Sequence, residues 1–158
     1  MDDGSTCPAD KTGDRVSVPY CFTRIATRGG HIYIAPDDYH MVVNPPPVSL
    51  GLNDEPKENY IRPSGDVLFD SVGKVFGEFC VAVILSGMGR DGARGAGKIK
   101  AGGGAVFVEN PGKSSSPSMP QTASSMANVC LPLDMIGEAI THQVTLSNKK
   151  LWNRKKQE

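Results

Sequence analysis

Val81-Ala82-Val83-Ile84-Leu85, followed at once by Ser86-Gly87-Met88-Gly89-Arg90-Asp91-Gly92, is the stretch that decides the fold. Its first part is apolar without polar alternation, which predicts a β-strand covered on both faces. The glycines at 87 and 89 allow a tight turn. In an open α/β sheet, ligands and catalytic groups gather beyond the carboxyl ends of strands, where helices begin. The stretch therefore predicts a strand–turn–helix unit with a candidate site at Asp91.

Asp91 has two interpretations. Local sequence alone favours a structural one, in which Asp91 caps the helix that begins near Gly92, because aspartate at that position satisfies free amide groups. The chemical interpretation requires partner groups elsewhere in the chain.

The composition is that of a folded globular domain. The chain has 158 residues, of which 39% are hydrophobic and 22% charged, and its formal net charge is zero. This balance excludes a disordered chain and does not indicate a nucleic-acid partner. No apolar run approaches the roughly 20 residues that span a bilayer. The acidic start Met1-Asp2-Asp3-Gly4 does not resemble a secretory signal, so we expect a cytoplasmic protein without membrane insertion.

Four cysteines are present, and no pair has CxxC spacing, so neither a zinc site nor a disulfide framework is expected. Cys80 and Cys130 border or enter apolar segments, where we expect buried free thiols.

The first part of the chain predicts little regular structure. Residues 1–29 read as irregular, and residues 32–35 as a strand that turns at Asp37-Asp38. A return strand at 40–43 would complete a hairpin, with residues 45–63 as a loop.

Strands and helices alternate after Ser64. A helix capped by Ser64 ends at Gly77. Gly95 and Gly97 weaken the next helix, which indicates close backbone approach to a neighbour. The predicted elements are the helix 64–77, strand 81–85, helix 92–101, strand 105–108, helix 119–127, strand 128–131 and helix 133–140. This order predicts the α/β class, with a doubly wound, mainly parallel, Rossmann-like sheet in three layers.

Hydrolysis by a serine, a histidine and an aspartate needs three groups that orient or activate one another. Asp91 suits the orienting role, but no serine is well placed as the nucleophile. Loop hydrogen bonding is the more natural role for the candidates, which are Ser5, Ser86, Ser114, Ser115, Ser116 and Ser118.

The histidines are His31, His40 and His142, and sequence alone assigns none of them a catalytic role. They lack metal-ligand spacing, so no metal site is predicted. The glycines at 87, 89 and 92 lack the lysine and serine of a phosphate-binding loop, so no nucleotide cofactor is predicted.

Several segments together resemble the catalytic domain of bacterial chemotaxis protein-glutamate methylesterase (CheB-type). The resemblance covers roughly residues 30–141. Its segments are Gly30-His31-Ile32-Tyr33-Ile34-Ala35-Pro36 with His40-Met41, Arg62-Pro63-Ser64-Gly65-Asp66-Val67-Leu68-Phe69, Leu85-Ser86-Gly87-Met88-Gly89-Arg90-Asp91-Gly92, Ala101-Gly102-Gly103 and Met119-Pro120.

The resemblance implies a doubly wound parallel fold and a two-component signalling enzyme. Such an enzyme hydrolyses glutamate methyl esters on chemoreceptor signalling helices, and some members also deamidate glutamine. The family's serine–histidine–aspartate triad uses no metal or cofactor, and its aspartate corresponds to Asp91. Met88 and Gly89 would line the site near the oxyanion, and Met119 and Pro120 would lie at the substrate-side loop.

The chain departs from the family pattern at Ser118, where glycine is usual, and at Gly65, where an apolar residue is usual. In the family, the serine and the histidine lie well before the Tyr-Ile-Ala-Pro segment. Here only 32 residues precede Tyr33, and their one histidine, His31, matches a non-catalytic position. No receiver domain is seen.

We therefore expect an irregular segment 1–29, a partial methylesterase domain 30–142 that is incomplete at the N-terminus, and a solvated basic tail 143–158. An exposed sheet edge is expected, and the chain alone should be inactive. Two alternatives stay open. The chain is a non-catalytic remnant or receptor-binding module, or it is a self-contained hydrolase that uses Ser5 or a loop serine with His31 or His40.

Overall fold

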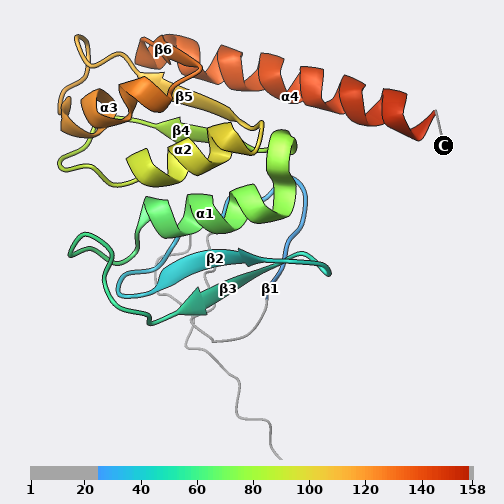
Figure 1. Cartoon of the computed structure of the whole chain (residues 1–158), viewed down its shortest axis with the longest axis horizontal. Helices are drawn as coiled ribbons and strands as arrows, with labels where there is room; N and C mark the ends of the chain where they lie inside the picture. Colours follow the sequence, from blue (N-terminus) through green and yellow to red (C-terminus); the bar gives the residue numbers. More distant parts are fainter. Residues whose placement is uncertain (1–24, 157–158) are drawn as a thin grey trace, which may run out of the picture. The chain divides into compact units, whose positions relative to one another are not determined.

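The computed structural model describes residues 25–156 (Figure 1). It divides the chain into two compact units, the first ending at Ser64 and the second beginning at Gly65. Most of the predicted irregular segment 1–29 lies outside the described residues.

The first unit contains a small antiparallel sheet. Its strands are β1 (Ile25–Ala26), β2 (His40–Asn44) and β3 (Ser49–Asn53), in the order β1-β3-β2. Val43 pairs with Leu50, and a turn over residues 45–48 joins β2 to β3.

The predicted hairpin of residues 32–35 with 40–43 is wrong, because β2 pairs with β3 instead. Residues 31–36 form no strand, and the side chains of Ile32 and Ile34 are exposed. The predicted loop 45–63 holds β3, whose apolar residues Leu50 and Leu52 alternate as in a strand. The prolines at 45–47 form the turn of this hairpin, not its end.

The second unit is an α/β layer structure. Its sheet has the order β4-β5-β6, all parallel, which confirms the predicted α/β class. The strands are β4 (Val81–Ile84), β5 (Ala105–Glu109) and β6 (Val129–Leu131). The helices are α1 (Gly65–Phe76), α2 (Ala93–Ala101), α3 (Ser118–Ala123) and α4 (Leu133–Lys155), with short 3₁₀ turns at Gly77–Phe79 and Ser124–Met126.

The core of this unit lies between the sheet and the helices α2 and α3. All of β5 is buried, whereas β4 alternates, with Val81 and Val83 only half-buried. The full cover on both faces that was predicted for the strand 81–85 is thus wrong at Val81 and Val83. The buried cluster consists of Cys80, Ala82, Ile84, Ala96, Ile99, Val106, Val108 and Ala123.

The two described cysteines differ. Cys80 is a buried free thiol that donates to the carbonyl of Gly77 at 2.9 Å, and burial raises its pKa. Cys130 is a free thiol but exposed, which corrects the prediction, because β6 is an edge strand among the described residues.

Helix α4 continues well beyond the predicted end at Ile140. The predicted tail is helical to Lys155, and two of its basic residues have a partner at the turn after α1. Arg154 contacts the carboxylate of Glu78 at 2.6 Å and Lys150 contacts it at 3.6 Å. No helix among residues 25–156 is long and apolar enough to cross a membrane.

Helices α1 and α2 lie side by side and pack closely against one another (Figure 1). A Cβ on Gly95 of α2 would lie 2.7 Å from the Cβ of Phe69 and 3.0 Å from the carbonyl oxygen of Asp66. A Cβ on Gly73 of α1 would lie 3.3 Å from the Cδ1 of Ile99. This confirms the close approach predicted for Gly95.

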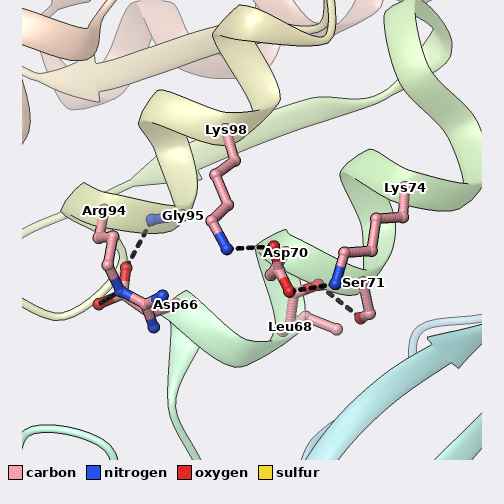
Figure 2. Close-up of polar contacts among 8 residues, drawn as sticks. All are labelled: Asp66, Leu68, Asp70, Ser71, Lys74, Arg94, Gly95 and Lys98. Atoms are coloured by element: carbon pink, nitrogen blue, oxygen red, sulfur yellow. Dashed lines mark hydrogen bonds and ion pairs between the residues drawn. The ribbon is translucent and has the colours of Figure 1, made fainter.

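An acidic residue in α1 also links the two helices. Figure 2 shows the Asp70 carboxylate between Lys74 of α1 and Lys98 of α2. The hydrogen bond from Lys74 and then that from Lys98 hold the pKa of Asp70 below its ordinary value.

We predict that Gly95→Ala destabilises the chain. The methyl group gains about 1 kcal/mol of helix propensity, but overpacking against backbone atoms costs about 1–3 kcal/mol. Urea unfolding measures the difference. Gly137→Ala in α4 is the control, because nothing lies within 4 Å of its Cβ, and it should stabilise the chain by about 0.5–1 kcal/mol. A stabilised Gly95→Ala variant would contradict the packing.

We predict that Asp70→Asn destabilises the chain by up to about 1 kcal/mol at neutral pH, the usual range for partly exposed ion pairs. Because the folded pKa is lowered, the wild-type advantage is complete above the unfolded pKa of about 3.9 and is lost as pH falls through the folded value. Urea unfolding from pH 7 to 2 measures this gap. A gap that persists at pH 2 would show that ion pairing is not its cause.

Candidate functional site

The site begins at the turn between β4 and α2. Ile84 ends β4, Gly89 and Gly92 take left-handed backbone conformations with φ of 88° and 82°, and α2 starts at Ala93. Gly92 is the N-cap residue of α2, and its carbonyl accepts the amide of Ala96 at 2.8 Å. The turn lies where the sequence placed it, at the carboxyl end of a parallel strand.

The segment before α3 and the first turn of α3 are bonded directly to this turn. The amide of Gly87 donates to the Ser116 carbonyl at 2.9 Å, and the amide of Met119 donates to the Gly87 carbonyl at 3.0 Å. The Ser118 hydroxyl donates to the Gly89 carbonyl at 2.9 Å. The structure thus brings together the glycine turn and the predicted substrate-side loop.

Met119 covers the turn closely. A Cβ on Gly87 would lie only 2.3 Å from the Met119 sulfur, so only glycine fits there without movement. Pro120 is buried within α3. Met88, by contrast, is 85% exposed at the tip of the turn. Of the predicted site-lining side chains, Met88 is therefore the one most open to a ligand.

Glu109 is a buried carboxylate that the sequence interpretation missed. It ends β5, is 4% exposed, and accepts the Ser86 amide at 2.6 Å. The contact fixes the start of the glycine turn against the neighbouring strand. The available signal was its position at the end of a wholly apolar strand, where a charged side chain needs a partner.

Asp91 caps a helix, but not the one predicted. Its carboxylate accepts the amide of Gly65 at 2.6 Å and the amide of Asp66 at 3.2 Å, both in the first turn of α1. Helix α2, which follows Asp91 in sequence, begins at Ala93 and has Gly92 as its N-cap residue. The sequence correctly predicted that Asp91 caps a helix, but it named the wrong helix. The amides that Asp91 caps belong to α1 and come close to it only because α1 and α2 pack together.

Asp66 is the counterpart of Asp91 on the other helix. Its side chain is almost fully buried and accepts the Gly95 amide in the first turn of α2 at 2.7 Å. Arg94 lies 3.8 Å from its other oxygen (Figure 2). Each helix N-terminus thus receives a carboxylate from the segment that begins the other, and negative groups there also match the helix dipoles.

Three histidines lie within the described residues. His40 is buried, and its two ring nitrogens contact the Pro56 carbonyl at 3.2 Å and the Ser64 amide at 3.2 Å. His31 contacts the Gly29 carbonyl and stacks on Tyr33. His142 is exposed on α4. The structure gives His31 and His40 backbone partners.

Two of the candidate serines donate to backbone carbonyls, and the bond of Ser114 lies within the loop, as predicted. Ser114 donates to the Ser116 carbonyl at 3.1 Å, and Ser118 to the glycine turn. Ser5 lies outside the described residues. Within residues 25–156, no group of three or more histidine, cysteine or acidic side chains could hold a metal ion.

Comparison with known proteins identifies relatives. The family model described as CheB methylesterase matches residues 15–140. A protein-glutamate methylesterase/protein-glutamine glutaminase of Rhodospirillum rubrum is 39% identical over 125 residues, which cover 78% of this chain and 32% of that protein. The protein-glutamate methylesterase FrzG of Myxococcus xanthus is 42% identical over 117 residues, covering 73% and 35%.

A solved structure agrees. The CheB methylesterase catalytic domain of Thermotoga maritima superposes with a TM-score of 0.66 at 32% identity, over 72% of this chain and 61% of that domain. The chain spans about a third of the length of the curated relatives it matches.

Proposed function

This chain belongs to the CheB methylesterase family, and from that premise we propose that it forms the aspartate-bearing part of a protein-glutamate methylesterase site. The observation that carries the proposal is the position of Asp91. It lies just beyond the carboxyl end of β4, in the glycine turn through which the chain resembles the family, with its carboxylate held by two amides.

In this role Asp91 orients a histidine. A triad aspartate accepts one imidazole N–H, which fixes the tautomer and stabilises the imidazolium that forms during reaction. The positive end of α1 stabilises the negative charge of Asp91. A fixed direction and a stabilised charge are what an orienting carboxylate needs.

The proposed reaction is hydrolysis of a glutamate methyl ester on a chemoreceptor signalling helix. A serine oxygen attacks the ester carbonyl, the histidine takes its proton, and methanol leaves with that proton. Water then releases the glutamate from the serine by the same path. On glutamine the leaving group is ammonia. Met88 and Gly89 would lie beside the oxyanion, and Met119 beside the substrate.

The serine and the histidine are not assigned within residues 25–156, where His31 and His40 already bond to backbone groups. We therefore propose that the chain alone does not turn over substrate. The site needs no cofactor or metal, and the cytoplasm is the compartment in which chemoreceptor signalling helices are met.

One observation favours a second candidate, a non-catalytic receptor- or partner-binding module. Both oxygens of Asp91 already serve a structural purpose, because they cap α1. A family member without a triad could keep Asp91 for this reason alone.

The test is a fusion in which the serine- and histidine-bearing segment of the Thermotoga maritima domain precedes Gly30 of this chain. We predict that the fusion releases methanol from methylated receptor, and that Asp91→Asn lowers kcat by about 10⁴-fold, as expected when a triad histidine loses its orienting carboxylate. KM should stay nearly constant.

Asp134→Asn, in the first turn of α4, is the matched control and should leave kcat unchanged. A folded fusion that keeps full activity with Asn at position 91 would exclude the catalytic role and leave the structural one. Turnover by the unfused chain would show that the chain contains its own nucleophile.

A further inference from the structure

Asp66 makes two kinds of contact at the junction of α1 and α2. Its main-chain amide donates to the Asp91 carboxylate at 3.2 Å, and its own carboxylate accepts the Gly95 amide at 2.7 Å. One residue therefore holds Asp91 with its backbone and α2 with its side chain. It thereby contacts both ends of the segment from Asp91 to Gly95.

This segment leaves little room for adjustment. The side chain of Asp66 is 1% exposed, so its charge is desolvated and depends on the Gly95 amide and on Arg94. A Cβ on Gly95 would meet the Cα of Asp66 at 3.1 Å, so the two backbones are already in contact. Loss of the Asp66 side chain would free the first turn of α2 to shift relative to α1.

Such a shift of α2 would also move Asp91, because Asp91 lies close to the start of α2 in the chain. Asp91 and Gly92 lead directly into α2, while the amides that hold the Asp91 carboxylate belong to α1. The direction of the carboxylate is therefore set by the position of α2 on α1, which the Asp66 side chain fixes.

We propose that Asp66 is a positioning residue for Asp91: its carboxylate locks α2 onto α1, so that the Asp91 carboxylate keeps one direction. As a statement about catalysis this rests on the proposed function of Asp91. The positioning itself is a property of the chain and is measured without turnover.

The first arm of the test uses the whole chain, labelled with ¹⁵N. Amide protons bonded to a carboxylate resonate downfield, so the Gly65 and Asp66 amides report the capping by Asp91, and the Gly95 amide reports the capping by Asp66. In Asp66→Ala we predict upfield shifts of the position 65 and 66 amides as well as of Gly95. Asp70→Asn is the matched control, because Asp70 also joins α1 to α2 through Lys98 without contacting Asp91, and it should leave the 65 and 66 amides unmoved.

The second arm uses the fusion described above. Asp66→Ala should lower kcat by about 10-fold or more with KM within about twofold, because small misplacements of a reacting group affect the chemical step. Asp66→Asn keeps an acceptor for Gly95 and should restore most of the rate. If the role of Asp66 were purely structural, Asp66→Ala would lower the amount of folded enzyme. In that case Asp66→Asn would not restore the rate, and kcat would not fall while KM stays constant.

The outcomes separate the two proposals. Full kcat in Asp66→Ala, where Asp91→Asn is inactive, overturns the positioning role alone. Full activity of Asp91→Asn overturns the proposed function, and the amide shifts then decide whether Asp66 positions Asp91. If Asp66→Ala does not fold, Asp66→Asn decides. In Asp66→Asn the Gly95 amide donates to a neutral acceptor, which makes a weaker hydrogen bond, so the Gly95 amide resonance should move upfield. The amide resonances of residues 65 and 66 should move by smaller amounts. If they do not move, the proposal is overturned.

Discussion

The exchange of carboxylates between the N-termini of α1 and α2 is the interaction on which the second unit depends. A helix leaves its first amides without intrahelical partners, and here those amides lie close to another backbone. Asp91 satisfies two of them in α1, and Asp66 satisfies one in α2. Glycine at position 95 permits the approach, because a side chain there would collide with Phe69.

The same arrangement organises the candidate site. Fixing Asp91 fixes the end of the glycine turn, while Glu109 fixes its start through the Ser86 amide. The middle of the turn is bonded to the start of α3, where Ser118 donates to Gly89. The turn holds Asp91 in place beside an exposed Met88, and the proposed ester hydrolysis would use such an ordered carboxylate beside an open surface.

The sequence predicted elements well where one pattern dominated. The apolar runs at 81–85 and 105–108 are β4 and β5, and the small-residue stretch after Gly92 is α2. The prediction from sequence failed where two patterns competed, as in β3. The alternating leucines of β3 indicate a strand, but the neighbouring prolines, glycine and asparagine indicate a loop. The capping partners of Asp91 and Asp66 could not be predicted, because the amides involved lie 25 or more residues away and meet only through packing.

A double-mutant cycle between Asp66 and Asp91 tests the carboxylate exchange most directly. Urea unfolding of the whole chain would be measured for Asp66→Ala, Asp91→Ala and the double variant, with Asp70→Ala plus Asp91→Ala as the control cycle. Because each bond supports the other, the double variant should be destabilised less than the sum of the single variants, by about 0.5–3 kcal/mol. Additivity within about 0.3 kcal/mol would show that the two helix caps act independently and would contradict the exchange.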